Sequence, residues 1–111
     1  MQPRLKAEIW VKAYIRRCFA SDIPAMVVRH GDDTAGTVLV KLNRFESGCT
    51  VFERTTDMDG NRAWRRGTGD DPVPEADADA FIERQAGFDP DLWVVEVESR
   101  DGTHLLEDPI V

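Results

Sequence analysis

The sequence predicts one α+β domain, with two helices and a largely antiparallel sheet of about five strands. A long segment near the start carries apolar residues at helical spacing, and a second, acidic segment follows Pro74 as a shorter helix. The remaining apolar runs are short and rich in β-branched residues, with turn residues between them. The predicted order is α-β-β-β-β-α-β. At 111 residues the chain has the length of one ordinary domain, so residues 1–111 are assigned to one unit.

The first helix is predicted over residues 4–21. Pro3 suits the first turn of a helix, and Pro24 lies just beyond its end. An apolar stripe at helical spacing should pack against the sheet. The stripe consists of Trp10, Val11, Tyr14, Ile15, Cys18 and Phe19.

Residues 25–30 and 37–44 are dense in apolar and β-branched side chains, which predicts two central strands. The segment between them reads Gly-Asp-Asp-Thr-Ala-Gly and has the composition of a hairpin loop. We therefore expect these two strands to pair directly.

A second hairpin is predicted from residues 49–56 and 61–66, around the Asp59-Gly60 pair that favours a two-residue turn. Such a turn places Glu53 opposite Arg66, an attractive pair, and Arg54 opposite Arg65, a repulsive one. The two arginines then either splay into water or hold a carboxylate or phosphate between them. Counter-charge could also come from the acidic helix, through Asp77, Asp79 or Glu83.

The second helix is predicted over residues 75–86 and ends at Gly87, with acidic residues in its first turn at the positive end of the helix dipole. A last strand follows at 92–99. Residues 104–106 could add a short edge strand.

Charge is unevenly distributed along the chain. The net charge is −7, which argues against a general nucleic-acid binder. Residues 1–66 hold 12 basic and 8 acidic side chains, whereas residues 67–111 hold 2 and 13. The split is consistent with an acidic part folded against a basic part, or with a two-faced surface for partners.

The cysteines and the apolar runs bear on location. Cys18 and Cys49 have no metal-ligand spacing and lie among apolar neighbours, so we expect free, buried thiols. No run approaches the ~20 apolar residues of a membrane span, and Lys6, Glu8 and Lys12 interrupt any signal-peptide core. The sequence therefore predicts a cytoplasmic protein that does not enter the membrane.

No motif in the sequence specifies catalysis, a cofactor or a metal. The sequence has no GxSxG motif and no catalytic signature around either cysteine. The acids beside His30 are more typical of turn hydrogen bonds than of metal ligation. The run from Asp57 lacks the later glutamate of a calcium loop. We expect no cofactor and no enzyme activity; the alternative is an enzyme with scattered site residues, which a deep pocket containing His30 would favour.

Several short motifs together resemble an uncharacterised bacterial family, domain of unknown function 1491, over nearly the whole chain. They are Trp10, Arg16-Arg17, Arg29-His30-Gly31-Asp32 with Gly36, Glu53-Arg54, Trp64 and the run Phe88-Asp89-Pro90-Asp91-Leu92-Trp93-Val94-Val95-Glu96. The resemblance implies a small α+β bacterial protein. It implies no activity, substrate or site.

The absence of a catalytic pattern favours a small accessory module that binds an unidentified protein partner. The alternative is a binder of an anionic ligand or nucleic acid through the hairpin 49–67, with Arg54, Arg65 and Trp64 as contacts. Arginine contacts to phosphate would make such binding steeply salt-dependent.

Overall fold

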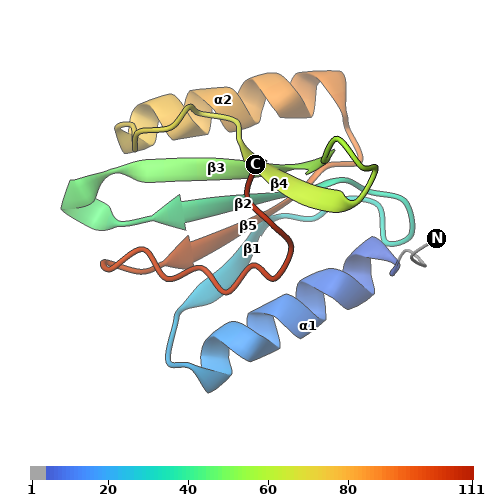
Figure 1. The fold of residues 1–111 in the computed structure, drawn as a ribbon, viewed down its shortest axis with the longest axis horizontal. Helices are drawn as coiled ribbons and strands as arrows, with labels where there is room; N and C mark the ends of the chain where they lie inside the picture. The colour runs from blue at the N-terminus through green and yellow to red at the C-terminus, as the bar shows by residue number, and fades with distance from the viewer. Residues whose placement is uncertain (1–4) are drawn as a thin grey trace.

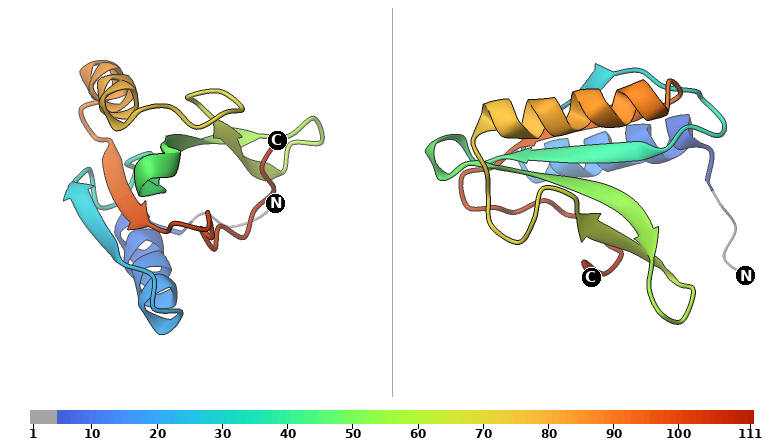
Figure 2. Two further views of the ribbon diagram at one scale, coloured as in Figure 1. Left: turned by 90° about the vertical axis from the view of Figure 1, so that its left-hand side faces the viewer. Right: turned by 90° about the horizontal axis from the view of Figure 1, so that it is seen from above.

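The computed structural model describes residues 5–111, in which a mixed sheet lies between two helices (Figures 1 and 2). The order confirms the predicted α-β-β-β-β-α-β arrangement and the α+β class, with one short 3-10 turn, η1, added. In chain order the elements are α1 (Ala7–Ala20), β1 (Ala25–Arg29), β2 (Val38–Asn43), η1 (Phe45–Ser47), β3 (Cys49–Thr56), β4 (Arg62–Arg66), α2 (Glu75–Phe88) and β5 (Trp93–Glu98).

Helix α1 begins later than predicted. Residues 3 and 4 lie outside the described part of the chain, and Lys6 is the extended N-cap residue, with no side-chain capping bond. A neighbouring loop caps the helix instead, because the N–H of Glu8 donates to the carbonyl of Asp33 at 3.0 Å. The start of α1 is thereby fixed to the segment that precedes β2.

The predicted apolar stripe of α1 is only partly buried. Its fully buried members follow strict helical spacing and are Val11, Tyr14 and Cys18. Trp10 and Ile15 pack at the margin of the same core, whereas Phe19 is 61% exposed, so its predicted burial was wrong. Neighbours in sequence lie about 100° apart around a helix, and the sheet contacts only the narrower stripe.

The strand order is β1-β5-β2-β3-β4, with β5 parallel to β2 and the other pairs antiparallel. The predicted direct pairing of 25–30 with 37–44 was wrong, because β5 lies between them. β5 opens with Trp93, Val94 and Val95, all fully or nearly buried, and these need cover on both faces of the sheet. β1 is therefore an edge strand rather than a central one, and Met26–Val28 are exposed.

The loop between β1 and β2 is built around the start of β5. The indole Nε1 of Trp93 donates to the carbonyl of Asp32 at 2.7 Å. A Cβ on Gly31 would lie 2.2 Å from the carbonyl oxygen of Asp91, and one on Gly36 2.5 Å from the same atom. The two glycines thus allow the backbone of the loop to lie close to the carbonyl of Asp91. The same glycine-containing composition also suits a hairpin loop, so it does not distinguish the two structures.

The predicted hairpin of β3 and β4 is confirmed, but its register is wrong by one residue. Glu53 pairs with Arg65, and Arg54 pairs with Trp64. Because successive side chains alternate between faces, this shift places Arg54 and Arg65 on opposite faces of the sheet.

The turn explains the shift. The carboxylate Oδ1 of Asp57 accepts hydrogen bonds from the N–H groups of Asp59 and Asn61, each at 2.9 Å. The N–H of Asp57 also donates to the carbonyl of Asn61, and Gly60 has φ +81°. This closes a three-residue loop with a left-handed glycine, one residue longer than the predicted turn.

Two glycine substitutions test the turn geometry. Gly60→Ala should cost about 1 kcal/mol, because an L residue is strained in the left-handed region even though the space is open. Gly87→Ala, within α2 and equally unobstructed, should instead stabilise by roughly 0.5–1 kcal/mol. Urea unfolding of both variants measures the two signs, and a Gly60→Ala protein as stable as wild type would contradict the turn described.

Each helix covers one face of the sheet (Figure 2). Leu39, Val51 and Val94 pack against α2, and the larger core beneath α1 includes Val40, Phe52, Trp64, Trp93 and Val95. Both cysteines are buried free thiols, as predicted. Among residues 5–111, no helix is long and apolar enough to cross a bilayer.

The predicted edge strand at 104–106 does not form. Leu105 has φ +56°, which interrupts an extended backbone there. The chain instead reaches β4 further on, where Ile110 makes an isolated parallel bridge with Trp64.

The predicted match between basic and acidic parts is seen in several ion pairs. Lys41 of β2 contacts Glu75 and Asp79 of α2 and Glu96 of β5. Basic side chains from residues 1–66 are also paired near the end of the chain, as Arg17–Glu107 and Arg54–Asp108.

Candidate functional site

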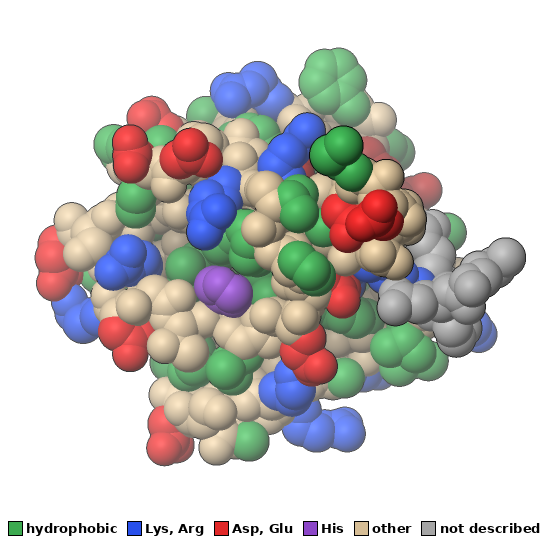
Figure 3. Space-filling view, in the orientation of Figure 1, with side chains coloured by type: hydrophobic (Ala, Val, Ile, Leu, Met, Phe, Trp, Pro, Cys, Tyr) green, Lys and Arg blue, Asp and Glu red, His purple; other side chains and the backbone are tan. Residues whose placement is uncertain are grey.

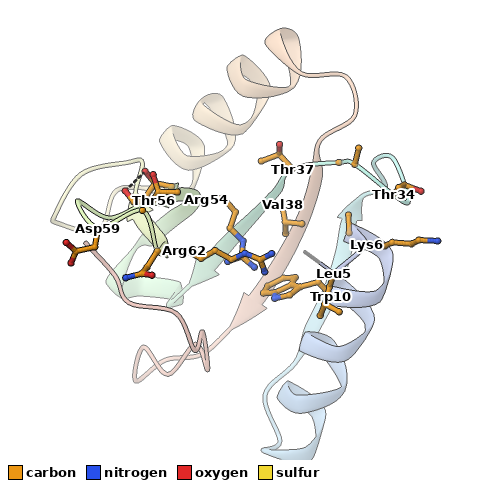
Figure 4. A pocket seen from close by; sticks show the side chains of 16 residues that line it. Leu5, Lys6, Trp10, Thr34, Thr37, Val38, Arg54, Thr56, Asp59 and Arg62 are labelled. Atoms are coloured by element: carbon orange, nitrogen blue, oxygen red, sulfur yellow. Dashed lines mark hydrogen bonds between the residues drawn. The ribbon is translucent and has the colours of Figure 1, made fainter. Parts of the chain in front are cut away.

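A cleft of about 1000 Å³ opens between the start of α1, the segment leading into β2, and the β3–β4 hairpin (Figure 4). α1 contributes Trp10 to it, and the hairpin contributes the ends of both strands and their turn. The lining residues are Leu5, Lys6, Ala7, Trp10, Thr34–Val38, Arg54–Thr56 and Asp59–Arg62.

Trp10 and Arg54 line one wall of the cleft, and the buried Trp64 lies behind them in contact with the guanidinium of Arg54. The Cζ atom of Arg54 lies 4.0 Å from the ring centroid of Trp64 and 4.9 Å from that of Trp10. The two indoles are 5.6 Å apart between centroids. Such cation–π contacts hold the guanidinium in a fixed orientation. Trp64 is buried, whereas Trp10 is half-buried and lines the cleft.

The stacked guanidinium already binds a carboxylate. Nη1 of Arg54 donates to Oδ2 of Asp108 at 2.8 Å, and neither side chain is fully exposed. The carboxylate comes from the segment that runs beside β4. Arg54 thus links the cleft to that segment.

Among the described residues that line the cleft, cationic side chains outnumber acidic ones. Figure 4 shows Arg54 and Arg62 reaching from the hairpin toward Trp10, with Lys6 at the rim. Asp59, in the hairpin turn, is the acidic side chain of the described lining. Threonine hydroxyls and short apolar side chains complete the walls. The cleft can therefore hold a carboxylate or phosphate beside an aromatic ring.

The three predicted contact residues do not form one site. Arg54 and Trp64 lie together, as the stack shows. Arg65 lies on the α2 face and makes an ion pair with Glu53, so the predicted anion site between Arg54 and Arg65 was wrong. Of the α2 acids expected to supply counter-charge, Asp79 binds Lys41 instead.

Sequence reasoning assigned neither Trp10 nor Arg62 to the site. The helical spacing predicts Trp10 as one member of a core stripe, and it does pack at the margin of that core. A tryptophan at the edge of a helical stripe, one turn from the helix start, is the signal that could have singled it out. Arg62 lies within the predicted hairpin, but no local pattern distinguishes it from the other arginines there.

The histidines lie outside the cleft. His30 is exposed, contacts Asp33 through Nε2 at 2.9 Å and packs on Trp93. His104 packs beside Phe52, and its Nδ1 accepts the N–H of Leu106. Burial, with the nearby positive charge of Arg66, lowers the pKa of His104 below its usual range. Residues 5–111 include no group of three or more His, Cys, Asp or Glu side chains placed to hold a metal ion.

Basic and acidic side chains are interspersed over the face of the molecule seen in Figure 3, without an extended patch of one sign among the described residues. A nucleic-acid backbone is usually bound by such a patch. The local excess of cations in the cleft is a smaller feature, of the size of a few side chains.

A family model described as "Protein of unknown function (DUF1491)" matches residues 5–107. None of the curated proteins matches the chain.

Solved structures of bacterial proteins share the fold. A crystal structure of a DUF1491 family protein from Caulobacter crescentus CB15 is 44% identical, with a TM-score of 0.87, and the match covers 97% of this chain and 100% of that one. An NMR structure of a DUF1491 family protein from the same organism is 43% identical, with a TM-score of 0.84, and the match covers 99% of each chain. The solution structure of protein Atu0922 from A. tumefaciens is 30% identical, with a TM-score of 0.73 over 87% of each chain.

Proposed function

Because the chain belongs to the DUF1491 family, whose described function is unknown, we propose a function from the geometry of the cleft. The protein is a small, non-enzymatic protein-interaction module that binds an acidic segment of a partner protein in that cleft. One observation carries the proposal. The guanidinium groups of Arg54 and Arg62 converge on Trp10 in an open cleft of a protein whose net charge is −7.

A carboxylate ligand fits better than a nucleic acid. Arg54 already binds the carboxylate of Asp108, which is the group an acidic peptide would offer. Outside the cleft, residues 67–111 hold 13 acidic side chains against 2 basic ones, which repel a polyphosphate backbone. An acidic peptide needs only the local excess of cations.

An enzyme active site is less consistent with this geometry. The described lining of the cleft contains no histidine, cysteine or glutamate, and its acidic residue, Asp59, lies in a solvent-exposed turn. General acid–base catalysis needs a titratable group held in the cavity beside the reacting atoms.

Charge reversal in the cleft tests the proposal. Proteins that co-purify with the tagged chain from its own cells would be compared for wild type, Arg62→Glu and Arg84→Glu. Arg84 is an exposed residue of α2, on the other face of the sheet, so its reversal changes the net charge equally without touching the cleft. Lys6→Glu, at the rim, is a second cleft variant.

A purified partner from that comparison should bind the two cleft variants at least about tenfold more weakly, as expected for losing a charge contact. Its affinity for Arg84→Glu should stay within about threefold, and wild-type binding should weaken from low to moderate salt. Equal affinity for wild type and Arg62→Glu would refute the proposal. If a single-stranded oligonucleotide binds wild type more tightly than the partner protein does, and Arg62→Glu loses that binding, the nucleic-acid alternative would replace the proposal.

A further inference from the structure

The segment 107–111 lies against β4 and is held there by contacts from four successive positions, 108 to 111. Asp108 binds the guanidinium of Arg54. The carbonyl of Pro109 accepts the N–H of Trp64 at 2.8 Å, and the N–H of Val111 donates to the carbonyl of Trp64, also at 2.8 Å. Ile110 bridges Trp64 in the parallel direction and packs on the core beneath α1.

These contacts follow the rules of an added strand. Two backbone bonds to one residue define the register, and alternate side chains, Asp108 and Ile110, point to the same face. Pro109, between them, contributes only its carbonyl to the hydrogen bonds with β4, so its missing N–H costs no hydrogen bond. The pattern is an acid, a proline and then an aliphatic residue.

The segment is held by few contacts beyond these. Residues 99–111 form no helix or strand except the isolated bridge. Further back, Arg17 pairs with Glu107, and the hydroxyl of Tyr14 donates to the carbonyl of His104 at 2.6 Å. A segment without regular structure opens at a lower free energy than the strands beside it.

We propose that segment 107–111 is an intramolecular ligand, and that the β4 edge with Arg54 binds, in its place, an extended partner segment of the same chemistry: a carboxylate, then proline, then an aliphatic residue, parallel to β4. This deepens the proposed function and rests on it, since Arg54 lines the cleft as well as binding Asp108. A partner segment must displace the chain's own one, which makes the chain its own competitor.

The test supplies the segment in trans. A chain ending at residue 107 would be titrated with a synthetic peptide of residues 106–111, Leu-Glu-Asp-Pro-Ile-Val, and so would the full chain. The shortened chain should bind the peptide, and the full chain should bind it at least about tenfold more weakly, because a tethered segment competes at an effective concentration of about millimolar. The Asp108→Asn peptide should bind the shortened chain several-fold more weakly.

Equal binding of the peptide to both chains, or no binding to a folded shortened chain, would overturn the inference. If the shortened chain does not fold, hydrogen exchange of the full chain decides. The Trp64 and Val111 amides should exchange faster than those of β2 and β5, and Asp108→Asn should accelerate them. Exchange of the Trp64 amide only through global unfolding would show that the segment is not displaced.

Two other outcomes are separable. A concentration-dependent dimer of the full chain would assign the β4 edge to the segment of a second copy and overturn the partner assignment. If peptide binding fails while a purified partner still depends on Arg62, this inference fails and the proposed function stands. If the peptide binds but no partner depends on Arg62, the displaceable segment stands and the proposed function fails.

Discussion

Replacing Trp64 with alanine is expected to lower the free energy of unfolding by about 3–5 kcal/mol, the range for a large buried aromatic. Trp64 is 1% exposed and belongs to the core beneath α1. The Cζ atom of Arg54 also lies 4.0 Å from the centroid of the Trp64 ring, in a cation–π contact. Since a domain of this size has only about 5–15 kcal/mol of stability, the variant should be close to unfolding at physiological temperature.

Urea unfolding followed by circular dichroism measures this loss. Trp64→Phe should recover most of it, because the ring keeps its packing and its face toward Arg54. Trp10→Ala is the matched control, since Trp10 belongs to the same stack but is only half-buried, and it should cost less. A loss below about 2 kcal/mol for Trp64→Ala would contradict the packing described.

Lys41→Met is expected to cost about 3 kcal/mol, the lower part of the range for removing one partner of a buried ion pair. The side chain of Lys41 is 4% exposed, and its Nζ lies 2.8 Å from Glu75, 2.7 Å from Asp79 and 3.2 Å from Glu96. Methionine fills the same space but leaves three carboxylates together without their cation. Because Glu75 and Asp79 are more than half exposed, water lowers the penalty.

The stability lost in Lys41→Met should depend on pH in the alkaline range. Burial acts to lower the pKa of Lys41, but hydrogen bonds to Asp79 and Glu75 and the charge of Glu96 outweigh it and raise the pKa above its usual 10.5. A raised pKa stabilises the folded state below the unfolded value and loses that stabilisation as the pH rises through the folded value. The stability gap between wild type and Lys41→Met should therefore be constant from neutral pH up to about pH 10 and narrow above it.

The exposed pair Lys12–Glu8 supplies the control. Lys12→Met makes the same substitution at a side chain that is 67% exposed, and it should change stability by less than about 0.5 kcal/mol. Lys41→Met with a cost as small as that of Lys12→Met would contradict the role given to Lys41.

The secondary structure could be predicted because its signals are local. The spacing on α1, the Asp59-Gly60 turn and the β-branched runs each act within a few residues. The insertion of β5 between β1 and β2 depends on contacts across the whole chain, and the loop composition is the same for a hairpin and for this crossover. The register of β3 and β4 depended on a single side chain, since the Asp57 carboxylate adds one residue to the turn.

The candidate site was only half predictable for the same reason. The predicted contacts directed attention to the right hairpin, and Arg54 and Trp64 do lie together there. Its partners Trp10 and Asp108 lie 44 positions before it and 54 after it, and no local pattern joins them to it. Arg65 was misplaced because an error of one residue in register reverses the face of the sheet.

The most direct test of the proposed interaction is chemical-shift mapping of the ¹⁵N-labelled protein bound to a purified partner. Backbone shifts should change at Trp10, Gly36, Thr55 and Arg62 around the cleft, and at residues 107–111 as that segment is displaced. β1 and α2 should be unaffected. Changes confined to β1 or α2, with the cleft residues unmoved, would contradict the account.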